Sequence, residues 1–197
     1  GFYAPGRGTA KYPALWDGCV GAWNPGLGNT GLSLRDHARG NNGVLTNGPT
    51  WGPVSGQQAL DFVAASSQYV PVADKDICYP TGSFTYAFWV MRVGGTYILA
   101  DYNSAANQSG IAFGFSGAKI DAFWENGGFP LVTSVTDLAL GVWYHVGFSW
   151  DGVIRRLYID GAEEATNATS QARPASAPGA LTVGRAGDYN GLYASGR

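Results

Sequence analysis

Residues 143–161, WYHVGFSWDGVIRRLYIDG, bring one histidine and two aspartates together in a short stretch. A histidine that is held by a carboxylate and bonded to a serine would form a hydrolytic triad. Each aspartate, Asp151 and Asp160, is followed by glycine, a pair that is typical of tight turns between strands. The segment is therefore either a catalytic cluster or a piece of β-sheet with polar side chains on one face.

The hairpin interpretation explains this segment best. A two-residue turn at 151–152 would pair Val146 with Leu157 and His145 with Tyr158. Side chains alternate along a strand, so the first pair would lie on a nearly all-apolar face and His145 on the opposite one, towards solvent or a groove. A triad would also need an exposed serine on a strained turn. We therefore interpret His145 as a strand residue without a catalytic role.

Paired carboxylates are the other arrangement that would support hydrolysis. Glu163 and Glu164 are adjacent, and adjacent strand residues point to opposite faces. Asp121 and Glu125 would share a face only if their strand ran straight through, and the glycines that follow favour a turn. The sequence has no HExxH motif and no phosphate-binding glycine loop. We expect no catalytic residues and no enzymatic activity.

Oxygen ligands suited to calcium gather in RDHARGNNG, residues 35–43. The candidate metal ligands are Asp36 and Asn42, and this segment provides only one carboxylate. The alternative is a turn in which the aspartate side chain bonds to the nearby backbone. Whether a structural calcium binds stays open at this point.

Composition and charge exclude several classes of protein. Charged residues make up 13% of the chain, against about 25% in an average soluble domain, and the net charge is -2. Such a chain does not attract nucleic acid, and no apolar run reaches the roughly 18 residues of a membrane span. A hydrophobic content of 45% argues against disorder. The only cysteines, Cys19 and Cys78, are either two thiols or one disulfide.

Short strands are the elements that must position these residues. Apolar and β-branched runs recur along the chain between clusters of turn-forming residues, which predicts an all-β sandwich or barrel. No segment has a long helical stripe, although residues 134–141 could form one turn of helix. Residues 1–17 are expected to be an extended arm, and residues 18–197 one domain.

The order of eight short blocks resembles the laminin G-like, concanavalin A-like jelly roll. The blocks are GCVGAW (18–23), LRDHARGNNGVLTNGPTW (34–51), ALDF (59–62), YVPV (69–72), GSFTYAFWV (82–90), WYHVGFSWDG (143–152), RLYIDG (156–161) and LTVGR (181–185). The resemblance implies an all-β, two-sheet antiparallel jelly-roll sandwich, in a class mostly used to bind glycans or proteins outside cells. Residues 15–37 are also similar to laminin G-like proteins of bacteriophages, which implies a virion.

Two departures from this family bear on function. Such domains normally continue, after a YNG-like turn, into a last strand with an acidic residue that pairs with the first strand and often helps to hold calcium. Here the sequence stops at YNGLYASGR (189–197), so the strand expected at 19–23 would have an exposed edge. Residues beyond Arg197, or another chain, would supply the missing strand. The three alternating acidic residues of concanavalin-like glycoside hydrolases are also missing.

We expect a non-catalytic recognition or adhesion domain that binds glycan, outside the cell or on a virion surface. Sugar sites stack an aromatic ring on the sugar and surround it with amides and carboxylates. Loops that combine such residues are therefore the places to look. The candidate ligand-binding residues are Tyr102, Asn103, Asp121, Trp124 and Asn126.

Two alternative functions stay open. The first is a structural decoration or fibre protein, whose partners are other protein subunits and which would oligomerise through the amino-terminal arm and the free sheet edge. The second is a concanavalin-like glycoside hydrolase. Binding to a glycan array would separate recognition from assembly, and release of reducing sugar would support the hydrolase.

Overall fold

The computed structural model describes residues 13–25, 31–54, 57–72, 82–95, 97–100, 111–124, 132–168, 180–185 and 193–196. Within these ranges the chain forms antiparallel strands and two short 3-10 helices, η1 (Pro13–Trp16) and η3 (Ala64–Ser66). No helix in the described ranges is long and apolar enough to cross a membrane.

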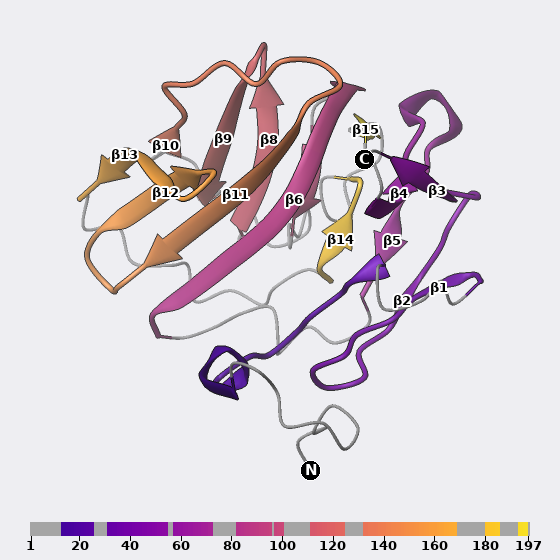
Figure 1. The fold of residues 1–197 in the computed structure, drawn as a ribbon, viewed down its shortest axis with the longest axis horizontal. Coiled ribbons are helices and arrows are strands. Elements are labelled where there is room, and N and C mark those ends of the chain that lie inside the picture. The colour runs from indigo at the N-terminus through magenta and orange to yellow at the C-terminus, as the bar shows by residue number, and fades with distance from the viewer. Residues whose placement is uncertain are drawn as a thin grey trace.

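Two large sheets form the body of the protein (Figure 1). In sheet order, the six-stranded sheet contains β10 (Val132–Thr133), β9 (Lys119–Trp124), β8 (Ile111–Ser116), β7 (Tyr97–Ala100), β14 (Thr182–Val183) and β5 (Val70–Pro71). The five-stranded sheet contains β13 (Ala162–Asn167), β12 (Arg155–Ile159), β11 (Trp143–Trp150), β6 (Phe84–Gly95) and β15 (Ala194–Gly196). Two small sheets are made of β1 (Ser33–Leu34) with β2 (Gly43–Val44), and of β3 (Thr50–Val54) with β4 (Gln57–Asp61).

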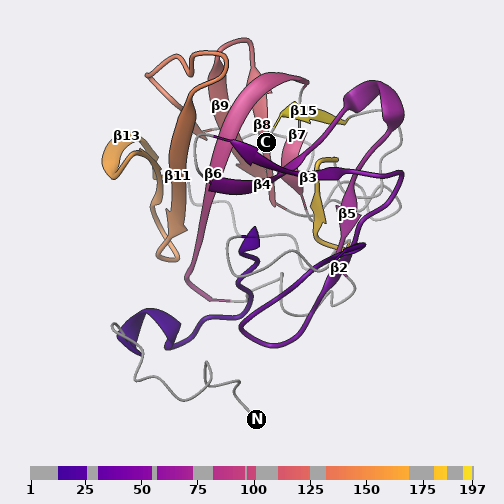
Figure 2. The same ribbon diagram turned by 45° about the vertical axis from the view of Figure 1, so that its right-hand side comes forward.

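The main core lies between the two large sheets, which form separate layers (Figure 2). Alternate residues of each strand point into it, because side chains alternate along a strand. Phe113 of β8 and Phe148 of β11 meet at its centre, with ring centroids 5.6 Å apart. Both are almost fully buried, and each such burial contributes about 1.5 to 3 kcal/mol. The predicted all-β, two-sheet antiparallel sandwich is confirmed.

The hairpin of β11 and β12 has a register that differs from the prediction by two residues. Val146 pairs with Ile159, and the loop between the strands has four residues, 151–154. Asp151 Oδ1 accepts the N–H groups of Val153 and Ile154 at 2.9 and 2.7 Å. The aspartate side chain therefore builds a wider turn than the predicted two-residue one. A shift of two keeps every side chain on its predicted face, so the apolar face is as expected.

The predicted turn at residues 160–161 is confirmed. Ile159 pairs directly with Ala162, and both loop residues have a positive φ, 51° for Asp160 and 83° for Gly161. Two such residues form the tight turn whose twist suits a two-residue hairpin loop.

The two ends of the described chain differ from the sequence-based expectation. Residues 19–23 form no strand, and Trp23 makes only a single β-bridge to Asp36. The N–H of Ala22 donates to the side chain of Asp36 and not to a neighbouring strand, so no ladder continues from this bridge. Near the carboxyl end, β15 pairs with the end of β6 and not with residues 19–23. Cys19 is a free thiol, and Cys78 lies outside the described residues.

Candidate functional site

Asp121 lies in the middle of β9, on the face of the six-stranded sheet that points away from the core. Its neighbours along the strand, Ile120 and Ala122, are in the core cluster and are both 0% exposed. Asp121 itself is only 9% exposed. Its Oδ1 atom has no hydrogen-bond partner among the described residues. Buried polar atoms are normally bonded, so this oxygen calls for an explanation.

The residues around Asp121 on this face have small side chains. Asp121 pairs with Gly114 of β8, and Ala112 lies two residues before that glycine. Ala112 pairs in turn with Ala100 of β7. Ala100 and Ala112 are 0% and 1% exposed although they point away from the core, so other parts of the chain cover this face. The carboxylate of Asp121 is thus buried above a floor of small residues, where an unpaired acceptor is costly.

The structure brings only part of the predicted ligand set into view. Trp124 ends β9, and its backbone pairs with Ile111; its side chain is outside the described part of the protein. Tyr102, Asn103 and Asn126 also lie outside the described residues. The predicted site is therefore anchored in the structure by Asp121 alone.

The histidine of the opening segment is a strand residue, as predicted. The ring of His145 lies against Trp89, with centroids 5.2 Å apart. Its backbone N–H donates to Asp160 Oδ1 at 2.8 Å, and its carbonyl oxygen accepts the N–H of Asp160, so it lies opposite Asp160 and not opposite Tyr158, its predicted partner. The two-residue shift in register causes this pairing. No described hydroxyl or carboxylate bonds to its imidazole.

The carboxylate of Asp36 accepts four backbone N–H groups. They come from Ala22 (2.8 Å), Ala38 (2.9 Å), Arg39 (3.1 Å) and Asn41 (3.0 Å). Asn42 Oδ1 in turn accepts the N–H of Asp36 at 2.9 Å. These bonds fit the predicted alternative of an aspartate turn, because both carboxylate oxygens face donors. The described residues contain no group of three or more His, Cys, Asp and Glu that could hold a metal ion.

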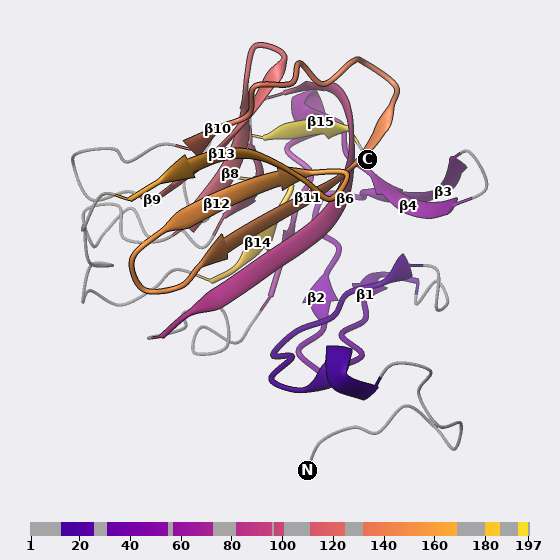
Figure 3. The same cartoon turned by 60° about the vertical axis from the view of Figure 1, so that its left-hand side comes forward.

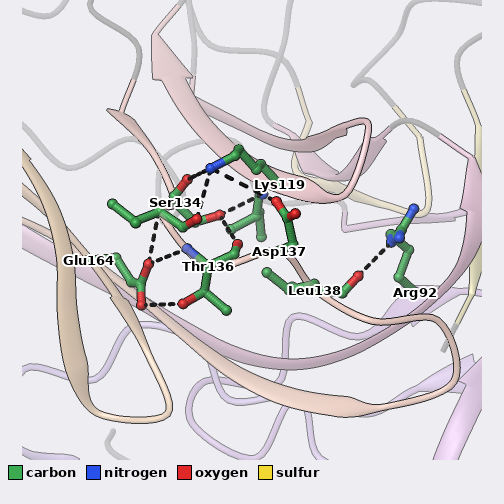
Figure 4. Close-up of polar contacts among 9 residues, drawn as sticks. Arg92, Lys119, Ser134, Thr136, Asp137, Leu138 and Glu164 are labelled. Carbon is green, nitrogen blue, oxygen red and sulfur yellow. Dashed lines mark hydrogen bonds and ion pairs between the residues drawn. The ribbon is translucent and has the colours of Figure 1, made fainter.

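Side chains of β9 and β13 fix the loop after β10 (Figure 4). Glu164 of β13 accepts the N–H groups of Val135 and Thr136 at 2.9 and 2.7 Å. Lys119 donates to the carbonyl oxygens of Ser134 and Val135 at 3.2 and 2.8 Å. Because these bonds hold the backbone open, residues 134–141 form bends and a turn and not the helical turn considered from the sequence.

Replacing Glu164 with glutamine is expected to lower the free energy of unfolding by about 1 kcal/mol at neutral pH. Burial alone would raise the pKa of Glu164, but the hydrogen bonds from Thr136 and Val135 lower it below its ordinary value. A carboxyl with a lowered pKa stabilises the fold above its ordinary pKa, and this contribution is lost as the pH falls through the folded value. Urea unfolding at neutral and acidic pH measures the effect.

The adjacent Glu163 provides a matched control for that experiment. Its one described ion pair, to Arg156, is 3.9 Å long, and its side chain is half exposed. Glu163→Gln should change the free energy of unfolding by less than about 0.5 kcal/mol. An equal loss for both variants, or a loss for Glu164→Gln that persists unchanged in acid, would contradict the assigned bonds.

The outer face of the five-stranded sheet carries a residue that sequence reasoning missed. Trp89 of β6 is 64% exposed, whereas Val90 beside it is in the core. The sequence contains a pattern that predicts this exposure: aromatic residues at positions 84, 86 and 88 alternate with the residues at 85, 87 and 89, which places Trp89 on the face away from the core.

The family of the chain follows from its sequence and agrees with this fold. The model of the concanavalin A-like lectin/glucanases superfamily matches residues 64–197. The chain belongs to this superfamily. The resemblance to laminin G-like, concanavalin A-like domains is thereby confirmed. A search of curated protein sequences finds no match to this chain.

Solved structures with low sequence identity share the superfamily fold. A structure of botulinum neurotoxin type C, whose cell entry depends on two ganglioside molecules, has a TM-score of 0.64 and 14% identity, covering 88% of this chain and 44% of that chain. Domain 4 of AbnA, a GH43 extracellular arabinanase from Geobacillus stearothermophilus in complex with arabinotriose, has a TM-score of 0.58 and 13% identity, covering 76% of this chain and 71% of that chain. Tailspike protein 2 of Escherichia coli O157:H7 bacteriophage CAB120 has a TM-score of 0.54 and 15% identity, covering 77% of this chain and 23% of that chain.

The chain spans less than half of the neurotoxin and tailspike chains that it matches. At these levels of identity, the likeness establishes the fold and leaves the function to be argued from the residues.

Proposed function

We propose that this protein is a recognition domain that binds glycan without cleaving it, and that Asp121 contacts the ligand. The observation that carries the proposal is the buried Oδ1 atom of Asp121, which has no partner among the described residues. An ionised carboxylate only accepts hydrogen bonds, and sugar hydroxyls are donors that can satisfy it. The arabinotriose and ganglioside named for two proteins of the same fold support this ligand class.

The charges on this sheet favour a neutral sugar. Lys119 is the only cation in the six described strands, and its ammonium group already bonds to two carbonyl oxygens. Those strands therefore provide an acceptor at Asp121 and no uncommitted cation. An acidic sugar would bring its own carboxylate near Asp121 without compensation.

Cleavage of a glycosidic bond would need a second carboxylate about 5 to 9 Å from the first. Asp121 is the only acidic residue in the described strands of the six-stranded sheet. Glu125, its partner in the hydrolase alternative, lies outside the described residues. Binding without catalysis is thus the function that the described residues support.

The remaining predicted ligand residues and the biological setting belong to the same proposal. Tyr102, Asn103 and Asn126 would complete the contacts around the sugar, whereas Trp124, which pairs with the core residue Ile111, stays a separate candidate. The extracellular arabinanase and the phage tailspike support an extracellular or virion-surface location. Assembly with other protein subunits, through the amino-terminal arm and a sheet edge, is the competing proposal.

Replacing Asp121 with asparagine is expected to weaken glycan binding at least about tenfold without lowering stability. The substitution keeps the shape of the side chain but removes a buried charge, so the free energy of unfolding should stay constant or rise by about 1 kcal/mol. A glycan array that contains arabinotriose and sialyllactose identifies the ligand, and calorimetric titration gives the affinity.

The matched control for this experiment is Asp137→Asn. Asp137 is 70% exposed and has one described ion pair, to Lys119 at 3.9 Å. The Asp137→Asn variant should bind glycan as tightly as the wild type does. The proposal would be abandoned if Asp121→Asn bound as tightly as the control, or if no glycan bound to the wild-type protein while it formed a stable oligomer.

A further inference from the structure

The outer face of the five-stranded sheet, whose strands Figure 3 shows side by side, lies on the opposite side of the sandwich from Asp121 and carries an exposed tryptophan. Trp89 is 64% exposed. Thr85 and Ala87, on the same face of β6, are also exposed. A tryptophan is normally a largely buried residue, so its exposure on a regular strand is informative.

His145 holds the indole ring of Trp89 in place. The two residues are direct partners on β6 and β11, with ring centroids 5.2 Å apart and ring planes at 56°. The backbone of His145 is itself fixed by its bond to Asp160 Oδ1. Trp89 is thus a positioned ring whose contact with His145 leaves most of its surface open.

Small residues lie on one side of this ring, and on its other side Met91 pairs with Trp143. Ala87 pairs with Gly147, which forms the next row of the face beside Trp89 and His145. A Cβ atom on Gly147 would lie 3.5 Å from the Cβ of Tyr158, so the glycine lets that tyrosine pack closely across the row. Tyr158 therefore covers Gly147, which is buried, and the face carries the rings of both Trp89 and Tyr158.

The charged groups at the margin of this face compensate one another. Arg156 bonds to Asp151 Oδ2 at 2.7 Å and approaches Glu163 at 3.9 Å. The hydrogen bonds from Ile154, Arg156 and Val153 lower the pKa of Asp151 to about 2, so the carboxylate stays ionised at neutral pH. Among the described residues, Arg156, Asp151 and Glu163 therefore offer polar partners to a ligand, and the cation of this group is already paired.

We propose that this face is a second ligand-binding surface, which stacks the C–H face of a neutral pyranose ring on Trp89. The indole provides the apolar plane that such stacking needs, and Thr85 and Ser149 form the second row from it, beyond Ala87 and Gly147, where their hydroxyl groups would bond to the next ring of an oligosaccharide. The strands β6, β11 and β12 together span about 10 Å, the width of one or two sugar rings. A protein partner would need an interface of about 800 Å² with an apolar centre. Among the described residues of β6, β11 and β12, only Trp89 and Val93 are large apolar residues that are exposed, which is too little for such a centre.

The test uses the full chain and a panel of neutral pyranose oligosaccharides, namely cellopentaose, mannopentaose and galactobiose. NMR spectra of the 15N-labelled protein report the indole N–H of Trp89, assigned by its disappearance in Trp89→Phe. At least one sugar should shift this signal saturably. Trp89→Ala should weaken that binding at least about tenfold, whereas Trp89→Phe should retain part of it.

Val153→Ala is the control, because Val153 is a similarly exposed apolar residue, at 62%, outside this face. It should bind the sugar as the wild type does, and Asp121→Asn should retain the Trp89 signal shift, since the two surfaces are on different sheets. The inference is wrong if no sugar of the panel shifts the Trp89 signal, or if Trp89→Ala alters only self-association in sedimentation experiments. Loss of the Trp89 shift in Asp121→Asn would also overturn it, because one site would then explain all binding.

Discussion

Replacing Asp36 with asparagine is expected to lower the free energy of unfolding by about 3 kcal/mol. The side chain is 3% exposed, and each of its two oxygens accepts two backbone N–H groups. An asparagine keeps one acceptor oxygen and turns an NH2 group towards the other two donors. Those buried N–H groups would lose their partners, which costs more than the hydrogen bonds themselves contribute.

The same substitution should matter less as the pH falls. Burial alone would raise the pKa of Asp36, but the hydrogen bonds from Ala22, Ala38, Asn41 and Arg39 together lower it below its ordinary value. The carboxylate therefore stabilises the fold above its ordinary pKa and loses this effect as the pH falls through the folded value. The difference between wild type and variant should be full at neutral pH and shrink in acid.

Denaturant unfolding across this pH range measures both effects, with Asp137→Asn as the control for the loss of an exposed carboxylate. The control should differ from the wild type by less than about 0.5 kcal/mol. If Asp36→Asn were as stable as that control, the network that joins residues 19–25 to the turn at 36–42 would not be present in solution.

Replacing Gly184 with alanine is expected to destabilise the protein by a similar amount, about 3 kcal/mol. Gly184 has a φ of 83°, a conformation that alanine adopts at a cost. An added Cβ would also lie 2.7 Å from two ring carbons of Phe62, which is itself 7% exposed. The backbone N–H of Gly184 bonds to Ile98 at 2.7 Å, so β7 would have to move as well.

Gly161→Ala separates the cost of the positive φ from the cost of the contact with Phe62. Gly161 has the same φ of 83°, but no atom lies within 4 Å of an added Cβ. It should cost only about 1 kcal/mol, the backbone contribution alone. Thermal unfolding should show a melting temperature for Gly184→Ala that is roughly 6 to 12 °C below the wild type. Equal losses for the two variants would mean that the contact with Phe62 is not close in solution.

Alternation along single strands could be read from the sequence, and it placed the apolar faces correctly. Val146 and Phe148 are buried and His145 lies on the opposite face, as predicted. The pairing of β11 with β12 could not be obtained in this way. It depends on where the carboxylate of Asp151 finds its donors, and an aspartate before a glycine suits both a two-residue and a four-residue loop.

Tertiary contacts decided the other differences. Residues 19–23 have the composition of a strand, but Asp36 binds their backbone with its side chain, so no ladder forms there. Asp121 was a candidate because of its loop-like surroundings in the sequence. Its importance comes instead from a buried oxygen without a described partner, which depends on the packing of β8 to β10 and is invisible in a single strand.

One NMR titration tests the central claim most directly. The 15N-labelled protein is titrated with the best ligand from the glycan array, while the anomeric signals of the sugar are followed in the same sample. The expected result is saturable shifts of the backbone amides of Gly114, Asp121 and Thr133, which are neighbours across β8, β9 and β10, with sugar signals that stay constant over time. New reducing-end signals would show catalysis, and unshifted amides around Asp121 would show that the ligand does not contact this sheet; either result would contradict binding without cleavage at Asp121.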